Sequence, residues 1–401
     1  MHTMCTIRHQ LGLEMAVEPQ NSQSQPLLLA EILRPEQNSF GVIRLAMAVV
    51  VLVSHSFYFV SGQASTEPLH SWTGHSLGEH AVQVFFFLSG ILVTESLLRG
   101  RGVIDFVTGR FLRIFPGLIV CVVLTAMMLG PISTSETLLG YLTDPALPLY
   151  VLKTISLTTG AAPLPGTFEQ LPAAGLVNLS LWTLKYEILC YAGLAVLGLS
   201  GLLNGAARKP TTALIAVVVF LIFLRSPSLD VPYSQTDNLR YFALYFGMGT
   251  LASLLKDQVV ISARSTIAFL ALYIASIGTP WAELSCSLLL GSLTLFAATW
   301  TFGPLRAWTN ARDLSFGVYI YAAPLQQVLL QADLGLSPLA LSLAAVVPAV
   351  VLAAASWGWI EKPSLSARNR YAQRLVSMAT GVASRLAGGA PIARDANTPQ
   401  F

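Results

Sequence analysis

The sequence predicts an all-α protein: a polytopic membrane helical bundle of about ten transmembrane helices, with both termini in the cytoplasm. Of its 401 residues, 54% are hydrophobic and only 11% are charged, whereas a soluble domain carries about 25% charged residues. Apolar runs of roughly 20 residues, the length of a helix that crosses about 30 Å of hydrocarbon, recur along the chain. The composition therefore excludes an ordinary soluble enzyme.

Ten apolar segments are candidate spans, and basic, polar or Gly/Pro-rich stretches separate them. The fifth and seventh segments are short, and all boundaries are set to within several residues. No internal repeat and no strand-like alternation interrupts the series. The segments lie near residues 42–62, 80–98, 112–130, 179–200, 212–225, 239–255, 263–278, 284–302, 314–334 and 337–359.

Two polar tails flank the membrane domain, which we place at residues 42–363. Residues 1–41 are rich in Gln, Pro, Glu and Ser, so they predict a disordered cytoplasmic tail and a first span that is a retained anchor. Residues 364–401 form a second cytoplasmic tail, which we expect to be mobile beyond about residue 375. The loop 131–178, with its many Pro and Gly and the short apolar run 147–157, predicts a re-entrant or interfacial segment.

The positions of the basic residues set the predicted orientation. Loops that retain Lys and Arg stay in the cytoplasm, and ten spans with the N-terminus inside place 18 of the 23 basic residues on that side. Lys153, Arg225 and Arg240 fall on the outer side, and Arg44 and Lys185 lie within spans. An even number of spans preserves this asymmetry, so both termini are predicted to be cytoplasmic.

Polar side chains within the spans are the candidates for function, because each is costly in lipid and normally faces the bundle interior. In the first span, Arg44 and His55 lie eleven residues apart, which places them within roughly 20° on one helix face and about 16 Å apart along the axis. This polar stripe fits a functional pair. As alternatives, Arg44 could snorkel to the inner interface and His55 could be a core histidine bonded to a neighbouring helix.

In the fourth span, the run SLWTLKYEILCY places Glu187 about 12 Å below the outer surface, close to the depth expected of His55. A carboxylate beside a histidine fixes its tautomer and stabilises its protonated form, as in acyl-transfer sites. We therefore expect Glu187 to orient His55. The alternative is that Glu187 pairs for packing with a donor on another span or with Lys185, which is poorly placed two residues away.

The third span opens with FVTGRFLRIFP, in which Arg110 and Arg113 are three residues apart and share a helix face at the inner mouth. Paired guanidinium groups suit phosphate, although positive-inside anchoring explains either one alone. In the second span, Glu95 lies four residues before Arg99 and predicts an ion pair at the inner interface.

Other polar positions favour structural interpretations. Ser89 and Gly90, near mid-depth of the second span, favour close helix packing. His70, His75 and His80 lack neighbouring cysteines and a fixed helical spacing, so we interpret them as exposed loop residues and predict no metal site. There is no P-loop and no Gly-x-Ser-x-Gly motif, which argues against ATP-driven transport and serine-hydrolase chemistry.

Seven segments occur in a characteristic order between Val42 and Pro363: RLAMAVVVLVSHSFYF, VFFFLSGIL, GRFLRIFP, SLWTLKYEILCY, YFALYFGMG, DLSFGVYIYAAPL and WIEKP. As an ordered set they resemble the acyltransferase-3 family of integral membrane O-acyltransferases. The resemblance implies a ten-span bundle that takes an acyl group, usually acetyl, from a cytoplasmic acyl-CoA and delivers it to a hydroxyl of a glycan or other acceptor. Lys185 and Tyr186 depart from the small or apolar residues that are commoner before the glutamate.

The resemblance also implies site residues. The family's first-span Arg and His match Arg44 and His55, and its paired arginines match Arg110 and Arg113. Its Ser-Leu-Trp…Glu motif matches 180–182 and Glu187. The three arginines are interpreted as the binding site for the CoA phosphates. His55 is interpreted as the general base on the acceptor hydroxyl, oriented by Glu187.

The expected donor is acyl-CoA, as acetyl-CoA or a succinyl counterpart, with no metal. The expected acceptor is a lipid-linked or surface glycan, such as an exopolysaccharide or lipopolysaccharide precursor. Membrane lipid is the other partner, nucleic acid is not one, and the location is the inner (plasma) membrane. Two rival functions are a secondary transporter of a small anionic solute and a membrane scaffold. The sequence lacks the paired Gly/Pro-broken spans in two equivalent halves that are typical of a transporter. A scaffold would not need polar groups at matching depths.

Overall fold

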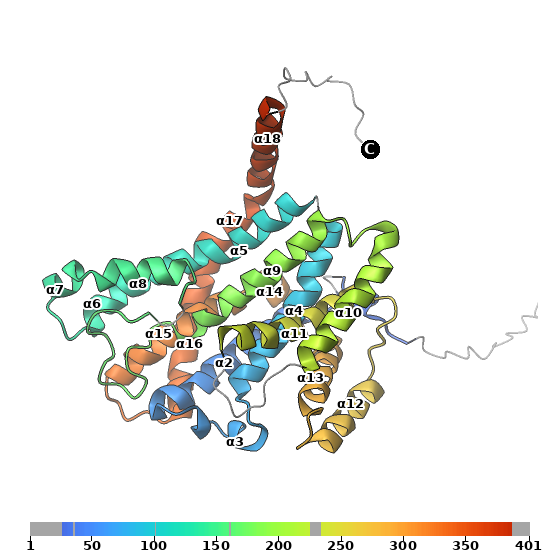
Figure 1. Cartoon of the computed structure of the whole chain (residues 1–401). Helices are drawn as coiled ribbons and strands as arrows, with labels where there is room; N and C mark the ends of the chain where they lie inside the picture. The colour runs from blue at the N-terminus through green and yellow to red at the C-terminus, as the bar shows by residue number, and fades with distance from the viewer. Residues whose placement is uncertain (1–25, 35–36, 101, 160–161, 225–233, 387–401) are drawn as a thin grey trace, which may run out of the picture.

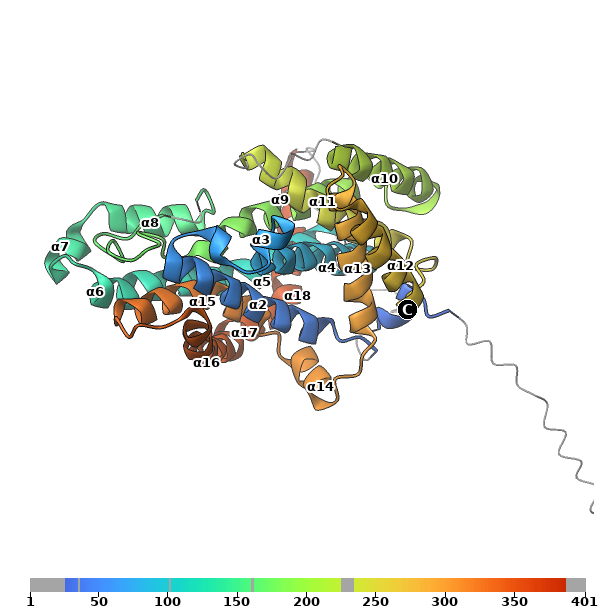
Figure 2. The same cartoon turned by 90° about the horizontal axis from the view of Figure 1, so that it is seen from below.

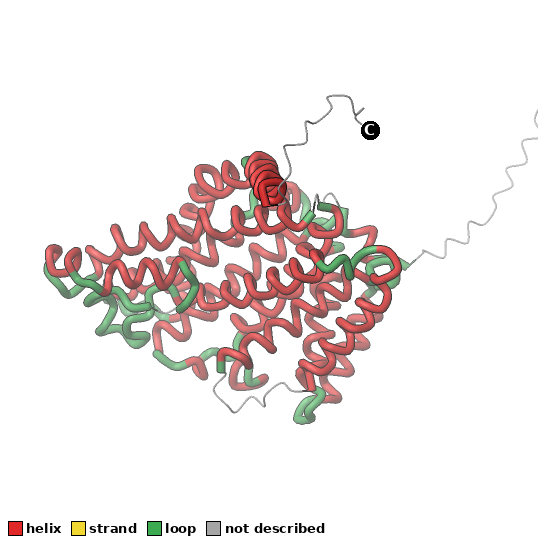
Figure 3. Tube along the Cα trace, turned by 45° about the horizontal axis from the view of Figure 1, so that its top comes forward, coloured by secondary structure: helices red, strands yellow, loops and turns green. Residues whose placement is uncertain are grey.

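The computed structural model describes residues 26–34, 37–100, 102–159, 162–224 and 234–386. Within those ranges every regular element is helical, and only isolated β-bridges occur (Figure 3). The prediction of an all-α chain is confirmed for this part of the molecule. Residues 1–25 and 387–401, which belong to the two predicted tails, lie outside it.

Each of the ten predicted segments overlaps a helix. Their boundaries follow from ordinary signals: α4, for example, begins with a capping box in which Ser76 and Glu79 bond each other's backbone N–H groups. The ten helices are α2 (Phe40–Ser61), α4 (Leu77–Arg99), α5 (Val103–Leu124), α9 (Leu184–Leu199), α10 (Arg208–Leu224), α11 (Gln235–Leu254), α12 (Ala263–Ser276), α13 (Ala282–Ala298), α15 (Ser315–Gln331) and α16 (Pro338–Ser356).

Shorter elements and one terminal helix connect and extend these ten. The π-helical turn η2 (Thr125–Leu129) joins α5 to α6, and η5 (Trp357–Glu361) joins α16 to α17. The 3-10 turn η3 (Leu179–Thr183) leads into α9. The others are α1 (Leu29–Ile32), α3 (His70–Thr73), α6 (Gly130–Ser133), α7 (Leu138–Thr143), α8 (Ala146–Ile155), α14 (Pro304–Ala311), α17 (Lys362–Ser366), α18 (Arg368–Leu386) and the 3-10 turns η1 (Ala64–Thr66) and η4 (Gly205–Ala207).

The helices pack in a continuous series around α2 and α4. α4 contacts α2 on one side and α11 on the other, α2 contacts α15 and α16, and α11 contacts α10. α5 contacts α8, α9 and α18. The short helices α6 to α8 project from one flank of the bundle, and α3 and α18 lie at opposite ends of it (Figures 1 and 2).

The described helices support a membrane-embedded bundle. Five helical stretches are long and apolar enough to cross a bilayer: Phe40–Ser61, Leu77–Arg99, Val103–Ser133, Gly205–Leu224 and Pro338–Met378. Three shorter apolar helices, α8, α12 and α13, accompany them. Ten spans and cytoplasmic termini remain predictions.

A glycine at the α4–α11 crossing confirms the packing expected near mid-span. A Cβ atom on Gly90 would lie 2.1 Å from the carbonyl oxygen of Phe246, and one on Gly249 would lie 2.1 Å from that of Phe87. The two backbones therefore approach more closely than any side chain allows. Small residues at a crossing are a common means of packing helices in lipid.

The third helix begins earlier than expected, at Val103 and not near residue 112. The predicted boundary fell between Arg110 and Arg113, which were expected at the inner mouth of the span. The carboxylates of Asp313 and Glu361 pair with Arg113 inside the bundle, and Asp105 in the first turn of α5 accepts hydrogen bonds of 3.0 and 2.6 Å from Arg368. Arg110 and Arg113 therefore lie well within a helix.

Ordered structure extends into both predicted tails. Leu29, Ile32 and Leu33 are buried, and the amide of Leu29 donates to the Val259 carbonyl at 2.9 Å. Apolar side chains thus fix this part of residues 1–41 against the bundle. At the other end α18 continues to Leu386, where mobility was expected beyond about residue 375.

The long loop at residues 131–178, predicted to lie outside the membrane, carries its own short helices. α8 has 10 residues, which is too short to span, as predicted. It packs against α5, and the hydroxyl of the buried Tyr141 donates to the Ala126 carbonyl at 2.6 Å. This segment is therefore folded onto the bundle over its described residues.

Candidate functional site

Two adjoining cavities lie inside the bundle and contain the five candidate residues. The first, called here the arginine cavity, has a volume of about 110 Å³ and is lined by Arg44, Arg110, Arg113 and Glu187. The second, called the histidine cavity, has a volume of about 320 Å³ and is lined by His55. The wall between them consists of the residues that line both: Val82, Thr183 and Tyr319.

Three helices bring the candidates to these cavities. α2 carries Arg44 in its second turn and His55 three turns later, α5 carries the other two arginines, and α9 carries Glu187 in its first turn. α4 contacts both α2 and α9, and α5 contacts α9. The arginine cavity therefore gathers residues that are distant in the sequence.

Carboxylates hold two of the arginines. Arg113 forms ion pairs with Glu361 at 3.0 Å and with Asp313 at 2.6 Å, and Arg44 shares Asp313 at 3.1 Å. The rings of Phe316 and Trp357 lie 5.5 and 5.9 Å from the Arg113 guanidinium carbon. The cluster is thus close to charge balance, and its guanidinium groups are fixed in position.

Asp313 lies between α14 and α15 and forms ion pairs with one arginine of α2 and one of α5. Burial alone would raise the pKa of its carboxyl, but the charges of Arg113 and Arg44 and hydrogen bonds from Ser315 outweigh burial and hold that pKa well below its usual range. The Ser315 hydroxyl donates at 2.6 Å. Asp313 is therefore a permanent anion that ties α2 to α5.

Arg110 differs from the other two arginines. Among the described residues it forms no ion pair, and its Nε is buried without a hydrogen-bond partner. The ring of Tyr191 lies 5.9 Å from its guanidinium carbon. Its charge therefore remains available to an anionic ligand in the arginine cavity.

Glu187 does not orient His55, contrary to the sequence prediction. Its carboxylate accepts hydrogen bonds from the hydroxyls of Ser89, at 3.1 Å, and Tyr191. No hydrogen bond joins it to His55 in the described part of the chain. Equal depth along two helices did not imply contact, because the side chains face different cavities. Ser89, interpreted as a packing residue, instead lines the arginine cavity.

His55 lines the histidine cavity with its Nδ1 buried and without a hydrogen-bond partner among the described residues. The ring of Phe59 packs edge-on against the imidazole at 6.0 Å between centroids. Since no carboxylate is bonded to the imidazole, the ring is available to accept a proton from a ligand. Arg44 and His55 share a helix, as predicted, but serve neighbouring cavities.

Comparison with known proteins identifies the family. A family model described as an acyltransferase domain matches residues 38–358. The chain belongs to the acyltransferase-3 family. It is 36% identical over 341 residues to a protein named O-acetyl transferase from Shigella phage Sf6, covering 82% of this chain and 97% of the phage protein.

A second relative of this acyltransferase is Nodulation protein 10 from Rhizobium leguminosarum bv. viciae, 28% identical over 373 residues, or 86% of this chain and 97% of the relative. No solved structure matches the chain at a significant level. The family and the phage relative confirm the resemblance drawn from the ordered segments. The protein is an O-acetyltransferase-like enzyme.

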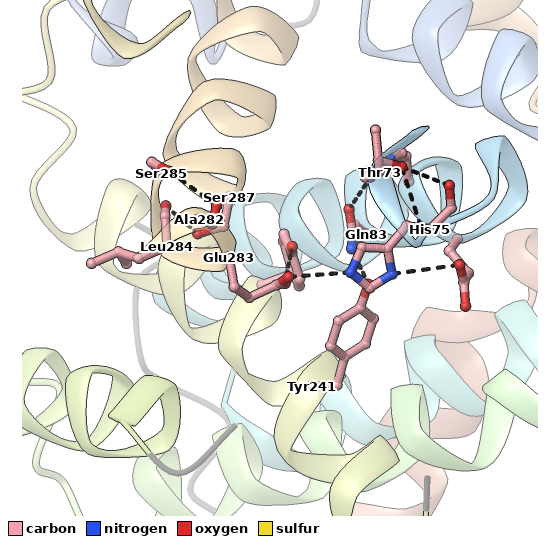
Figure 4. Close-up of polar contacts among 12 residues, drawn as sticks. Thr73, His75, Gln83, Tyr241, Ala282, Glu283, Leu284, Ser285 and Ser287 are labelled. Atoms are coloured by element: carbon pink, nitrogen blue, oxygen red, sulfur yellow. Dashed lines mark hydrogen bonds and ion pairs between the residues drawn. The ribbon is translucent and has the colours of Figure 1, made fainter. Parts of the chain in front are cut away.

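The prediction that His75 is an exposed loop residue of this acyltransferase is wrong. His75 lies just before α4 in a cluster of charged and aromatic side chains. His75 is buried, not exposed, and forms ion pairs with Glu79 at 3.5 Å and with Glu283 of α13 at 3.3 Å (Figure 4). It also stacks on Tyr241 of α11 at 5.9 Å between centroids. The Tyr245 hydroxyl donates to Glu283 at 2.8 Å. The cluster therefore connects α4, α11 and α13 beside the histidine cavity.

The charge state of His75 follows from these contacts. Burial alone would lower its pKa, but the carboxylates of Glu283 and Glu79 outweigh burial and raise the pKa to about 9. The imidazole is therefore a cation at neutral pH. Periodicity could not reveal this, because Glu283 lies more than 200 residues further along the sequence.

Glu95 and Lys185 are two further charged residues within the predicted spans of the acyltransferase. Glu95 pairs with Arg99 at 2.8 Å, as predicted, and also with Lys256 at 2.9 Å. Lys185 lies 4.8 Å from the ring centroid of Tyr186. Among the described residues, no group of three or more His, Cys, Asp or Glu is placed to hold a metal.

Asp313 and Glu361 pair with the candidate arginines but were not among the residues predicted for the site. Both lie in segments that carried the family resemblance, DLSFGVYIYAAPL and WIEKP. Each is a lone carboxylate beside a long apolar run, and Glu361 is fully buried. A carboxylate within an apolar segment needs a cationic partner. The position of these two carboxylates beside apolar runs could therefore have indicated that they pair with the arginines.

Proposed function

We propose that this enzyme transfers an acetyl group from cytoplasmic acetyl-CoA to a hydroxyl of a cell-surface glycan at the inner membrane. The observation that carries the proposal is the pair of adjoining cavities: one holds arginines and the other holds a histidine. A donor and an acceptor would each occupy one cavity and meet at their common wall. The name of the phage relative supports acetyl as the group.

The arginine cavity suits the donor. Phe85, Leu92 and Ile114 are among its apolar lining residues, which fits the uncharged arm of CoA. Arg110 supplies a charge without a carboxylate partner for a phosphate group, and Arg44 and Arg113 are fixed beside it. Guanidinium groups bind phosphate through paired hydrogen bonds.

The histidine cavity suits a carbohydrate acceptor. Aromatic rings of Trp182, Tyr241 and Phe242 line it together with the polar side chains of Asn238 and Glu79. Apolar ring faces and a few oriented polar groups are the usual components of a small-molecule site. The glycan would enter from the outer side, as a lipid-linked oligosaccharide or an exopolysaccharide or lipopolysaccharide precursor.

The reaction assigned to this arrangement is direct acyl transfer. The acceptor oxygen attacks the thioester carbonyl carbon while His55 accepts the hydroxyl proton. A carbon–oxygen bond forms, the carbon–sulfur bond breaks, and the CoA thiolate leaves and takes up a proton. Glu187 positions Tyr191 and Ser89 in the arginine cavity and has no direct part in the proton transfer.

Labelled acetyl-CoA tests the proposal. Membrane vesicles containing the enzyme should move label into their glycan fraction, and His55→Ala should lower that rate by about 10²- to 10⁴-fold. Arg110→Gln should raise the KM for acetyl-CoA. The controls are His70→Ala and Arg370→Gln, which alter residues that line neither cavity.

Glycan that stays unlabelled with the unaltered enzyme would contradict the proposed reaction and favour the transporter. Labelling that persists at the normal rate in His55→Ala, at equal protein level, would remove His55 from the mechanism. An unchanged KM in Arg110→Gln would remove the donor from the arginine cavity.

A further inference from the structure

Three buried side chains, those of Val82, Thr183 and Tyr319, form the wall between the two cavities. The hydroxyls of Thr183 and Tyr319 lie 2.6 Å apart, and the Ser180 hydroxyl donates to the backbone carbonyl of Tyr319 at 2.7 Å. The ring of Phe85 packs edge-on against that of Tyr319 at 5.9 Å. Val82 completes the wall, and all three wall residues are buried.

Acyl transfer between the cavities restricts where the acyl group can lie. Its carbonyl carbon must still be bonded to the CoA sulfur in the arginine cavity when the acceptor oxygen beside His55 reaches it. Reacting atoms must approach to about 3 to 3.5 Å. Among the described residues, only the wall residues face both cavities.

We infer that the wall of Val82, Thr183 and Tyr319 is the acyl-binding position, where the Tyr319 hydroxyl donates to the carbonyl oxygen and Val82 limits acyl length. The inference rests on the proposed function. In the resting enzyme the Tyr319 phenol can donate to the Thr183 hydroxyl. That hydroxyl in turn donates to the Ser180 carbonyl at 3.3 Å. The phenol can then transfer its hydrogen bond to the thioester oxygen.

The wall would stabilise the tetrahedral intermediate. As the acceptor oxygen bonds to the carbonyl carbon, the carbonyl oxygen gains the negative charge and His55 holds the acceptor proton. When the carbon–sulfur bond breaks, the charge leaves with the CoA thiolate. A fixed donor at the developing oxyanion is worth about 10²- to 10³-fold in kcat.

The first test removes only the phenolic hydroxyl. Tyr319→Phe should lower kcat for acetyl transfer by about 10²-fold and leave the KM for acetyl-CoA within twofold. Tyr141→Phe, which removes a buried hydroxyl that lines neither cavity, should leave both constants unchanged. A Tyr319→Phe enzyme with unaltered kcat would overturn the role of Tyr319.

The second test concerns acyl length, with acetyl-CoA and butyryl-CoA as probes and free CoA thiol as the readout. Val82→Ala should raise the ratio of kcat/KM for butyryl over acetyl transfer by about 10-fold or more, given the discrimination that one or two methylenes provide. Val84→Ala, on the same helix and outside both cavities, should leave the ratio unchanged. An unchanged ratio in Val82→Ala would overturn the wall as the acyl site.

Failure of this inference differs from failure of the proposed function. In the first case the unaltered enzyme labels glycan and His55→Ala does not, while the wall variants behave like their controls. In the second case the unaltered enzyme itself moves no label.

Discussion

Arg113 depends on its two carboxylates as much as they depend on it. Its guanidinium group lies between Asp313 and Glu361, and both carboxylates are largely buried. A buried charge left without its partner is far more costly than the intact pair is favourable. Arg110 has no such partner among the described residues, so two arginines three residues apart have different tasks.

Replacing each arginine by glutamine should separate those tasks. Arg113→Gln should lower the free energy of unfolding by about 3 to 5 kcal/mol, because Asp313 and Glu361 lose their shared cation. Arg110→Gln should cost much less stability and act on donor binding. Thermal unfolding of the purified enzyme checks the difference, and equal losses would contradict it.

His75 gives the fold a pH dependence. Its pKa is raised to about 9, so the folded state binds the proton more tightly than the unfolded chain does. The stabilisation is fully present below the unfolded pKa near 6.5 and is lost as the pH rises through about 9. It amounts to at most about 3 kcal/mol.

The melting temperature of the enzyme should therefore fall between pH 6.5 and about 9.5, and His75→Asn should remove most of that fall. His70→Gln, an imidazole lost from the preceding helix, serves as the control and should keep the fall. A His75→Asn enzyme with the full pH dependence would place the titrating group elsewhere.

At the scale of helices, the sequence predicted elements better than it predicted their ends and partners. Apolar length placed ten helices, because lipid demands that each span satisfy its own backbone. The start of α5 was missed because Arg110 and Arg113 resemble a loop boundary in the sequence when Asp313 and Glu361, the distant carboxylate partners of Arg113, are not considered. The His55–Glu187 contact failed for a related reason: helical periodicity gives depth and facing on one helix but not the rotation of one helix against another.

The α4–α11 crossing permits an element-scale prediction. Gly90→Ala should destabilise the bundle by about 1 to 3 kcal/mol or more, since its Cβ would meet a backbone carbonyl that cannot move alone. Gly193→Ala in α9, where a Cβ meets no atom within 4 Å, is the matched control. The two variants are compared by the fraction of protein that stays folded in detergent after heating. Equal fractions would contradict a close crossing.

For the whole molecule, the all-helical class and the family followed from composition and ordered segments. The two-cavity site did not. Each of the five candidates lines a cavity, and their roles there stay predictions, whereas the wall residues are ordinary in type and carry no signal in a sequence. Val82 and Thr183 become candidates only because the structure places one cavity on each side of them.

Orientation is the prediction at this scale. The cysteines at 121, 190 and 286 are buried, and the change Cys5→Ser removes the fourth. A cysteine then added at an exposed position shows on which side of the membrane that position lies. A membrane-impermeant maleimide should label Ser71→Cys in intact cells and Ser366→Cys only after permeabilisation. The opposite pattern would invert the bundle.

The wall between the cavities also bears on how the cell would power export of an acyl group. A donor confined to one cavity and an acceptor confined to the other need never exchange sides, so only the acyl group would cross the plane of the wall. The free energy of the thioester would then drive a vectorial reaction. Such an enzyme would require neither an ion gradient nor a separate carrier for its activated substrate, because neutral reacting groups give neutral products and no net charge crosses the membrane.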